Sequence, residues 1–188
     1  MSIVYLNGEW MQMEEARISP MDRGFLFGDG IYEVIPSYGR HMVGCGPHLQ
    51  RMRDGLAALD IHLSMDDAEW RSIIDHLITR NGGGNLGVYL HVSRGADAKR
   101  SHAYPEDIQP TVFAFTFEIP PEAKPDPHTV KQYRVSTTQD LRWQRCNIKS
   151  TALLGNVMHY QFGHAQGGDE TILYNDAGEL TEAAACNV

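Results

Sequence analysis

Alternating apolar and polar residues indicate where the strands of this chain lie. Residues 3–13 alternate around Asn7-Gly8, a dipeptide suited to the positive backbone dihedrals of a two-residue turn, so we expect the chain to open with a β-hairpin. Residues 30–38 add β-branched and aromatic side chains to this alternation and predict a further strand. Residues 86–92 and 111–118 have the same composition and predict two more strands, separated by a polar loop.

Apolar residues at spacings of three and four predict two helices between these strands. The first is expected to begin at Pro47, and the second to be capped by Ser64, with acidic residues in its first turn. Each helix has one apolar face that should be buried. The first face consists of Leu49, Met52, Leu56 and Leu59, and the second of Trp70, Ile73, Ile74, Leu77 and Ile78.

A proline-rich segment divides the chain. Residues 119–127 contain four prolines, which remove backbone donors and favour an extended backbone, so neither strand nor helix should continue through them. The sequence therefore predicts one domain at 1–120, an interdomain linker at 121–127 and a second domain at 128–188. In the second domain we expect strands near 130–136, 171–175 and 178–188, and a helix from about 150 to 165 with a buried stripe of Leu153, Leu154, Val157, Met158 and Phe162.

The composition is that of a folded, soluble protein and argues against several functions. With 188 residues, 42% of them hydrophobic, the chain can bury one core or two small ones. A formal net charge of -8 without clustered Lys and Arg argues against nucleic acid or an anionic membrane as a partner. No apolar stretch reaches the ~20 residues of a membrane helix, and no signal peptide is visible, so we expect a cytoplasmic location. The cysteines lie far apart without a Cys-x-x-Cys pair, which favours neither disulfides nor a zinc site.

Lys149 stands at the start of the third expected helix, between Ile148 and Ser150. A partly desolvated lysine has a lowered pKa, which frees its amine as a nucleophile. Taken alone, however, this lysine would be interpreted as an exposed helix-start residue, because most lysines are exposed. The motifs elsewhere in the chain change that interpretation.

Four motifs occur in order along the chain: Arg23-Gly-Phe-Leu-Phe-Gly-Asp-Gly-Ile-Tyr-Glu33, His48-Leu-Gln-Arg51, Asn147-Ile-Lys-Ser-Thr-Ala-Leu-Leu-Gly-Asn156 and Leu180-Thr-Glu-Ala-Ala-Ala-Cys-Asn-Val188. Together they resemble the class IV aminotransferases of fold type IV, and within them the D-amino-acid transaminases. The resemblance extends over essentially the whole chain. It implies a mixed α+β fold of two domains, a small N-terminal α/β domain and a larger, β-barrel-like C-terminal domain that binds pyridoxal phosphate.

The resemblance assigns four residues to this cofactor. Lys149 matches the lysine that forms the Schiff base and shuttles the proton, in a ping-pong transamination between an amino acid and a 2-oxo acid. Arg51 matches the arginine that binds the phosphate, for which a planar guanidinium is well suited, although its residue type would equally fit a solvated helix charge. Glu182 matches the carboxylate that keeps the pyridine nitrogen protonated, and could otherwise be an ordinary strand-end residue. Arg142 is expected to join the hydrogen bonds around the cofactor or Glu182.

Three further residues match the substrate site of the D-amino-acid transaminases. Arg100 and His102 form an Arg-x-His pair that, with Tyr32, is expected to bind the substrate carboxylate. In that family the loop comes from the other subunit, so a homodimer is implied. By resemblance the substrates are D-alanine and D-glutamate, with pyruvate and 2-oxoglutarate as acceptors. The alternatives are an aminodeoxychorismate-type lyase, a branched-chain aminotransferase, and a non-catalytic fragment or binding protein.

The sequence departs from the family pattern in two places. Ala183-Ala184-Ala185-Cys186 stands where the family commonly has glycine and serines, so hydroxyls near the cofactor are missing. The chain also ends at Val188, within an expected core strand, and about a third of the usual length is absent. On this basis the 188-residue chain alone is expected to be inactive or nearly so without a complementary fragment. No metal site is expected, since His159 and His164 lie five residues apart on one helix rather than four.

Overall fold

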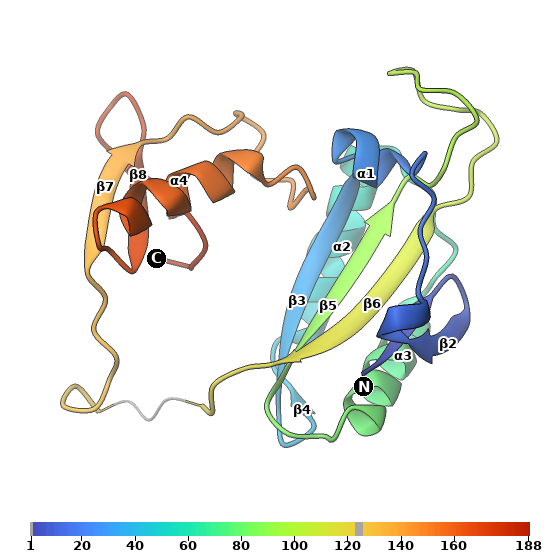
Figure 1. The fold of residues 1–188 in the computed structure, drawn as a ribbon, viewed down its shortest axis with the longest axis horizontal. Coiled ribbons are helices and arrows are strands. Elements are labelled where there is room, and N and C mark those ends of the chain that lie inside the picture. The colour runs from blue at the N-terminus through green and yellow to red at the C-terminus, as the bar shows by residue number, and fades with distance from the viewer. Residues whose placement is uncertain (1, 123–125) are drawn as a thin grey trace. The chain divides into compact units, whose positions relative to one another are not determined.

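In the computed structural model of the chain, which describes residues 2–122 and 126–188, an antiparallel sheet of six strands frames the N-terminal half (Figure 1). Its strand order is β2-β1-β6-β5-β3-β4. The predicted hairpin is confirmed, because Asn7 and Gly8 both have positive φ and join the first two strands. The strands are β1 (Ile3–Leu6), β2 (Glu9–Gln12), β3 (Gly30–Tyr38), β4 (His41–Met42), β5 (Leu86–Ser93) and β6 (Thr111–Glu118).

Two long helices, α2 (Cys45–Ala58) and α3 (Asp67–Arg80), pack against the sheet and bury its main core. The predicted inner face of α3 is confirmed, and on α2 the buried residues include Leu49 and Met52, each 1% exposed. The predicted cap at Ser64 is wrong. Asp66 caps α3 instead, because its side chain accepts from the backbone of Glu69, whose own carboxylate accepts from the backbone of Asp66.

Two short helical segments lie in the stretch before β3. They are the 3-10 turn η1 (Met13–Glu15) and the helix α1 (Arg23–Phe27). Neither was expected from periodicity, since a single turn shows too few residues to define a stripe. Asp22 starts α1 by accepting from the backbone of Gly24, and Gly28 ends it with φ of 67°.

The C-terminal half forms a smaller sheet of order β7-β8-β9. The helix α4 (Leu154–Ala165) connects β7 (Val135–Gln139) to its parallel neighbour β8 (Glu170–Tyr174), and β9 (Leu180–Ala183) then pairs antiparallel with β8. β7 lies further along the chain than the strand predicted near 130–136, and β9 is shorter than the strand predicted at 178–188. β8 differs from its prediction by one residue. The expected β-barrel-like shape of this domain stays a prediction.

The predicted buried stripe of α4 is wrong. Leu154, Val157 and Met158 are 71%, 60% and 65% exposed, while the buried residues of this helix are His159 and Gly163. The reason lies in the contact with β8, where a methyl group on Gly163 would collide with the hydroxyl of Thr171. Only the small and polar face of α4 permits this close approach, so its apolar side chains point away from the sheet.

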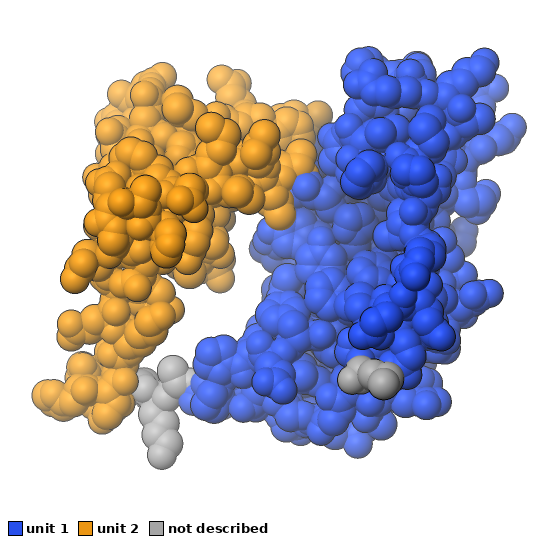
Figure 2. All heavy atoms as spheres, in the orientation of Figure 1, with its two compact units in different colours: residues 1–122, 147–151 blue, residues 123–146, 152–188 orange. Residues whose placement is uncertain are grey.

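The chain separates by its contacts into two compact units, which Figure 2 shows in different colours. Unit 1 comprises residues 1–122 together with 147–151, and unit 2 comprises 123–146 and 152–188. Residues 123–125 of the predicted linker lie outside the described residues. Within the described ranges, no helix has the length and apolar character needed to cross a membrane.

Candidate active site

Lys149 lies on an extended segment that adds to the edge of β3 in unit 1. The backbone N–H of Tyr32 donates to the carbonyl of Lys149 at 3.1 Å, and that of Thr151 donates to the carbonyl of Gly30 at 3.0 Å. The prediction of a helix from about residue 150 is therefore wrong at its start, because sheet pairing holds these residues extended and α4 begins only at Leu154.

The alternation of this extended segment sets the direction of the Lys149 side chain. Its neighbours Ile148 and Ser150 are 4% and 7% exposed and face the core, so Lys149 points to the opposite face of the sheet, where Tyr32 also lies. The Lys149 ammonium donates to the Tyr32 hydroxyl at 3.2 Å and lies 4.4 Å from the centre of its ring. The structure thus brings two of the predicted site residues together.

Aromatic side chains extend from Tyr32 across this face of the sheet. Tyr32 stacks on Tyr89 with ring centres 5.6 Å apart, and Tyr89 contacts Phe115 at 5.0 Å. Burial, with a smaller contribution from Tyr32, raises the pKa of Tyr89 to about 12, and burial lowers the pKa of His91. Near neutral pH both side chains are therefore uncharged, and they share a contact of 3.2 Å between the Tyr89 hydroxyl and Nδ1 of His91.

Arg51, on α2, forms a bidentate ion pair with Glu33 of β3. Its Nε and Nη2 donate to the two carboxylate oxygens of Glu33 at 2.5 and 2.7 Å, and Nδ1 of His48 lies 2.8 Å from the same carboxylate. The side chain of Glu33 is 0% exposed, whereas that of Arg51 is 49% exposed. The pair fixes the orientation of the guanidinium and leaves about half of the side chain in solvent.

Glu182 of β9 is paired with Arg142 in unit 2. Nη1 of Arg142 donates to Glu182 at 2.5 Å, while its Nε and Nη2 donate to the two carboxylate oxygens of Asp140 at 3.0 and 2.8 Å. Thr181 also donates to Asp140, at 2.7 Å. Hydrogen bonds from Arg142 hold the pKa of Asp140 well below its usual range, against the opposing effect of burial. The expected contact between Arg142 and Glu182 is present.

Arg100 and His102 lie on the exposed loop before β6, and both contact the ring of Phe27. The guanidinium carbon of Arg100 is 5.1 Å from the ring centre, and the two ring centres of His102 and Phe27 are 5.2 Å apart. Among the described residues, no hydrogen bond joins either side chain to Tyr32 or Lys149. The structure brings the pair together but leaves its role with Tyr32 a prediction.

The four residues from Ala183 to Cys186 lie at the end of β9. Ala183 and Ala184 are 2% and 3% exposed, and the carbonyl of Ala184 accepts from the side chain of Asn156 at 3.0 Å. The backbone N–H of Ala184 donates to Thr171 at 2.9 Å. These backbone groups are therefore engaged within unit 2, where the family commonly offers hydroxyls.

Sequence reasoning missed Glu33 and Asp140, the partners of two predicted site residues. Glu33 stands in β3 and meets Arg51 of α2 only through a tertiary contact, whereas Asp140 directly follows β7 and pairs with Arg142 two residues further on. One signal was available for Glu33, because a carboxylate amid the apolar alternation of residues 30–38 requires a buried partner.

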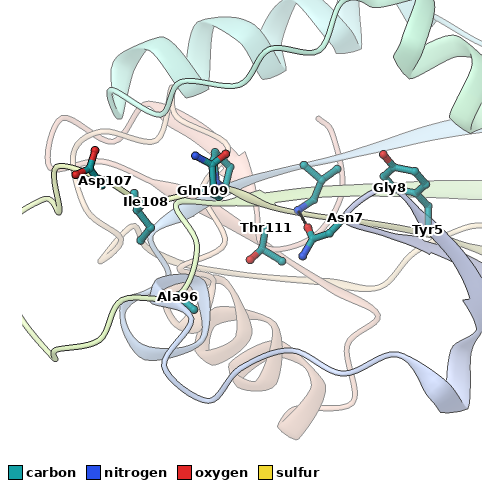
Figure 3. A pocket seen from close by; sticks show the side chains of 10 residues that line it. Tyr5, Asn7, Gly8, Ala96, Asp107, Ile108, Gln109 and Thr111 are labelled. Atoms are coloured by element: carbon teal, nitrogen blue, oxygen red, sulfur yellow. Dashed lines mark hydrogen bonds between the residues drawn. The ribbon is translucent and has the colours of Figure 1, made fainter.

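A separate pocket of about 690 Å³ lies at the start of β6 (Figure 3). The β1–β2 turn, Ala96 and residues 107–112 line it, and it contains none of the predicted site residues. Nowhere in the described parts of the chain do three His, Cys, Asp or Glu side chains gather in a way that could hold a metal ion.

The comparisons with known proteins identify the family. A family model described as "Amino-transferase class IV" matches residues 30–188. The chain is 38% identical over 185 residues to a D-alanine aminotransferase of Bacillus licheniformis, covering 98% of this chain and 64% of the relative. It is 34% identical over 190 residues to a D-alanine aminotransferase of Staphylococcus epidermidis, covering 100% and 65%. The chain thus spans less than two thirds of the length of these relatives.

Solved structures share the fold at lower identity. A branched-chain amino acid aminotransferase of Escherichia coli is 18% identical with a TM-score of 0.82, over 97% of this chain and 62% of that one. A branched-chain aminotransferase of Thermoproteus uzoniensis, solved with norvaline, is also 18% identical, with a TM-score of 0.80 over 97% and 63% of the two chains. The predicted fold class is confirmed, and pyridoxal phosphate is the cofactor of the matched class. The chain belongs to amino-transferase class IV.

Proposed function

We propose that this chain carries active-site residues of a pyridoxal-phosphate-dependent aminotransferase that acts on D-amino acids. The observation that carries the proposal is the placement of Lys149 on the edge of β3, with its amine 3.2 Å from the Tyr32 hydroxyl. A lysine at the surface of a helix start has no reason to be flanked by two buried residues and aimed at a tyrosine. Lys149 meets both conditions.

The functional groups of the two units fit those of the cofactor. The amine of Lys149 suits an aldehyde, and the pre-oriented guanidinium of Arg51, whose side chain is 49% exposed, suits a phosphate. In unit 2, the carboxylate of Glu182 is 44% exposed and suits a protonated pyridine nitrogen. We assign these residues to hold the cofactor, with Arg142 as the residue that fixes the direction of the Glu182 carboxylate.

Lys149 and Tyr32 have separate roles in the proposed reaction. When bound, pyridoxal phosphate withdraws electrons from the substrate Cα and so makes its proton removable. Lys149 Nζ acts as the base toward the Cα–H and afterwards, as an ammonium, as the acid. The Tyr32 hydroxyl accepts a hydrogen bond from Nζ, which keeps the amine at one position on the sheet face.

The preference for D-amino acids rests on two supports. The curated relatives at 31–38% identity are D-alanine aminotransferases. The branched-chain enzymes are similar at only about 18% identity, a level that supports the shared fold but not a shared substrate. The exposed Arg100 and His102 offer charged and polar donors for a carboxylate. We assign them, with Tyr32, to the carboxylate of D-alanine or D-glutamate and of the 2-oxo acid acceptors, in a cytoplasmic homodimer that shares the loop between subunits.

A spectral titration tests the proposal. The 188-residue chain is combined with a complementary C-terminal fragment and supplemented with pyridoxal phosphate. The visible band of the lysine-bound cofactor is then followed during addition of D-alanine or L-alanine. We expect D-alanine to convert the band to that of the pyridoxamine form, and Lys149→Ala to have no band. Lys131→Ala, a change at an exposed lysine, is the matched control and should behave as the unmodified chain. Absence of the band in the unmodified protein, or conversion by L-alanine alone, would overturn the proposal.

A further inference from the structure

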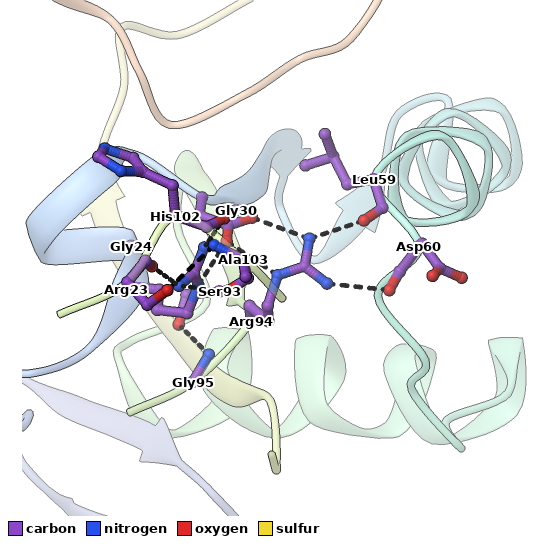
Figure 4. Close-up of polar contacts among 12 residues, drawn as sticks. Arg23, Gly24, Gly30, Leu59, Asp60, Ser93, Arg94, Gly95, His102 and Ala103 are labelled. Atoms are coloured by element: carbon purple, nitrogen blue, oxygen red, sulfur yellow. Dashed lines mark hydrogen bonds and ion pairs between the residues drawn. The ribbon is translucent and has the colours of Figure 1, made fainter. Parts of the chain in front are cut away.

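Three charged side chains form a buried cluster between α1, β3 and the loop that carries Arg100 and His102 (Figure 4). Asp29 lies between two arginines, whose Nε atoms both donate to its Oδ2 at 2.8 Å. The side chains of Arg23 and Arg94 are each 4% exposed, and that of Asp29 is 10% exposed. None of these three residues belongs to the site described above.

The cluster has an excess positive charge, which backbone carbonyls compensate. Burying a guanidinium costs free energy unless each N–H finds an acceptor. One carboxylate has too few acceptor sites for all the N–H groups of two guanidinium groups. Arg94 donates to the carbonyls of Leu59 and Asp60, at 2.7 and 3.0 Å, where α2 has just ended. Burial alone would raise the pKa of Asp29, but hydrogen bonds from Arg94 and Arg23 outweigh it and leave the pKa below its usual value.

The carbonyls that accept hydrogen bonds from the Arg23 side chain all belong to the loop. Nη1 of Arg23 donates to the carbonyl of Ser101 at 2.5 Å and to that of Ala103 at 3.3 Å, and Nη2 donates to that of His102 at 3.4 Å. One guanidinium thus binds three consecutive residues of a loop that forms neither helix nor strand there. The next residue of the loop, Tyr104, packs its ring against the Arg94 guanidinium, whose carbon lies 3.5 Å from the ring centre.

This arrangement holds the loop by its backbone and leaves its functional side chains at the surface. Arg100 and His102 are both exposed and both rest against Phe27, whose ring also lies 4.9 Å from the guanidinium of Arg23. A free loop of this length would sample many conformations, and ordering it at the moment of binding would cost affinity. Here the buried cluster orders the loop before any ligand arrives.

We propose that Arg23, Asp29 and Arg94 are positioning residues, which fix the loop 100–104 in the conformation that presents Arg100 and His102 to a substrate carboxylate. The part of this inference that concerns the carboxylate rests on the proposed function. The part that concerns the loop does not. An alternative is that the cluster only stabilises the fold, in which case loosening it would lower stability without a selective effect on the loop or on substrate affinity.

Arg23→Lys tests the first part without any enzymatic activity. A lysine keeps the charge and the trypsin site but has no fork to reach the carbonyls and Asp29 together. We expect trypsin to cleave the native full chain after Lys99 and Arg100 about tenfold faster, the change produced by ~1.4 kcal/mol in the free energy of loop opening. Arg40→Lys, at an exposed arginine, is the matched control. An unchanged cleavage rate for Arg23→Lys would overturn the proposal.

Steady-state kinetics test the second part. In the cofactor-loaded protein, Arg23→Lys should raise the KM for D-alanine and for pyruvate about tenfold and change kcat less than about twofold, because ground-state and transition-state binding of the carboxylate weaken alike. Faster trypsin cleavage with unchanged KM would overturn the carboxylate role. If the unmodified chain with its complementary fragment does not transaminate D-alanine, the proposed function fails, while the trypsin result still decides whether the cluster holds the loop.

A second variant covers the case in which Arg23→Lys does not fold. Tyr104→Leu removes the stack on Arg94 at a side chain that is 53% exposed, so the core is untouched. We expect cleavage after Lys99 and Arg100 to rise about threefold, in line with the ~0.5–1 kcal/mol of an exposed cation–π contact. No rise in this variant would contradict the claim that Arg94 holds the loop.

Discussion

Glu33→Gln removes one charge from the buried ion pair with Arg51 while conserving the size of the side chain. No cavity forms, so the loss of stability reports the changed polar contacts of this side chain with Arg51 and His48. Breaking a buried pair from one side costs about 3–5 kcal/mol. Because the Arg51 side chain is 49% exposed, its charge can rehydrate, and we expect a smaller loss of about 1.5–3 kcal/mol in the free energy of unfolding. The glutamine amide would also place a donor opposite the donors of Arg51 or His48.

Urea unfolding at neutral pH, followed by circular dichroism, measures this loss by linear extrapolation. Glu118→Gln, at an exposed glutamate of β6, is the matched control and should stay within about 0.5 kcal/mol. The double variant with Arg51→Gln completes a cycle that isolates the coupling energy of the pair. A loss below about 0.5 kcal/mol in Glu33→Gln, with no coupling, would refute the reasoning that this ion pair stabilises the fold.

Three further outcomes follow from single residues. The pKa of Asp140 is depressed in the folded chain, so its stabilising effect should be complete above about pH 4 and decline at lower pH. Asp140→Asn should flatten this part of the curve of unfolding free energy against pH. Identical curves for the variant and the unmodified chain would contradict the role of Arg142. Ultraviolet titration should show Tyr89 ionising near pH 12, later than the ordinary value of about 10, and Tyr89→Phe should remove that late step. Gly95→Ala should destabilise the chain by on the order of 3 kcal/mol, because φ is 107° and the methyl group would collide with the carbonyl of Gln109. A midpoint temperature of thermal unfolding within a degree of that of the unmodified chain would exclude this collision.

Local patterns predicted the N-terminal half well because its elements are decided by nearby residues. Asn7-Gly8 accounts for the first turn, and the periodicity of residues 70–78 accounts for the buried face of α3. Family motifs then located the candidate site, and the structure places Lys149 beside Tyr32 and Arg142 beside Glu182.

Periodicity failed where a neighbouring element decides the outcome. The apolar residues of α4 suggested a buried stripe, yet the close approach of Gly163 to Thr171 turns the opposite face toward the sheet. Lys149 was expected at a helix start and instead pairs with β3, because a vacant strand edge outweighs local propensity. The arginine partners of Glu33 and Asp29 could not be identified, since ion pairs between residues far apart in the chain leave no periodic signal in a single sequence. Asp140 pairs with Arg142 only two residues further on, but a short polar pair of this kind is equally common in solvated loops.

The short segment at 147–151 has a consequence for any dissection of this protein. It belongs to unit 1 by its contacts, although the residues before and after it belong to unit 2. A chain cut in the proline-rich region would therefore give an N-terminal piece that retains Tyr32 and Arg51 but lacks the lysine and exposes an edge of β3. The two units can be expressed apart as intact bodies only if residues 147–151 are grafted onto the first, for instance through a new loop.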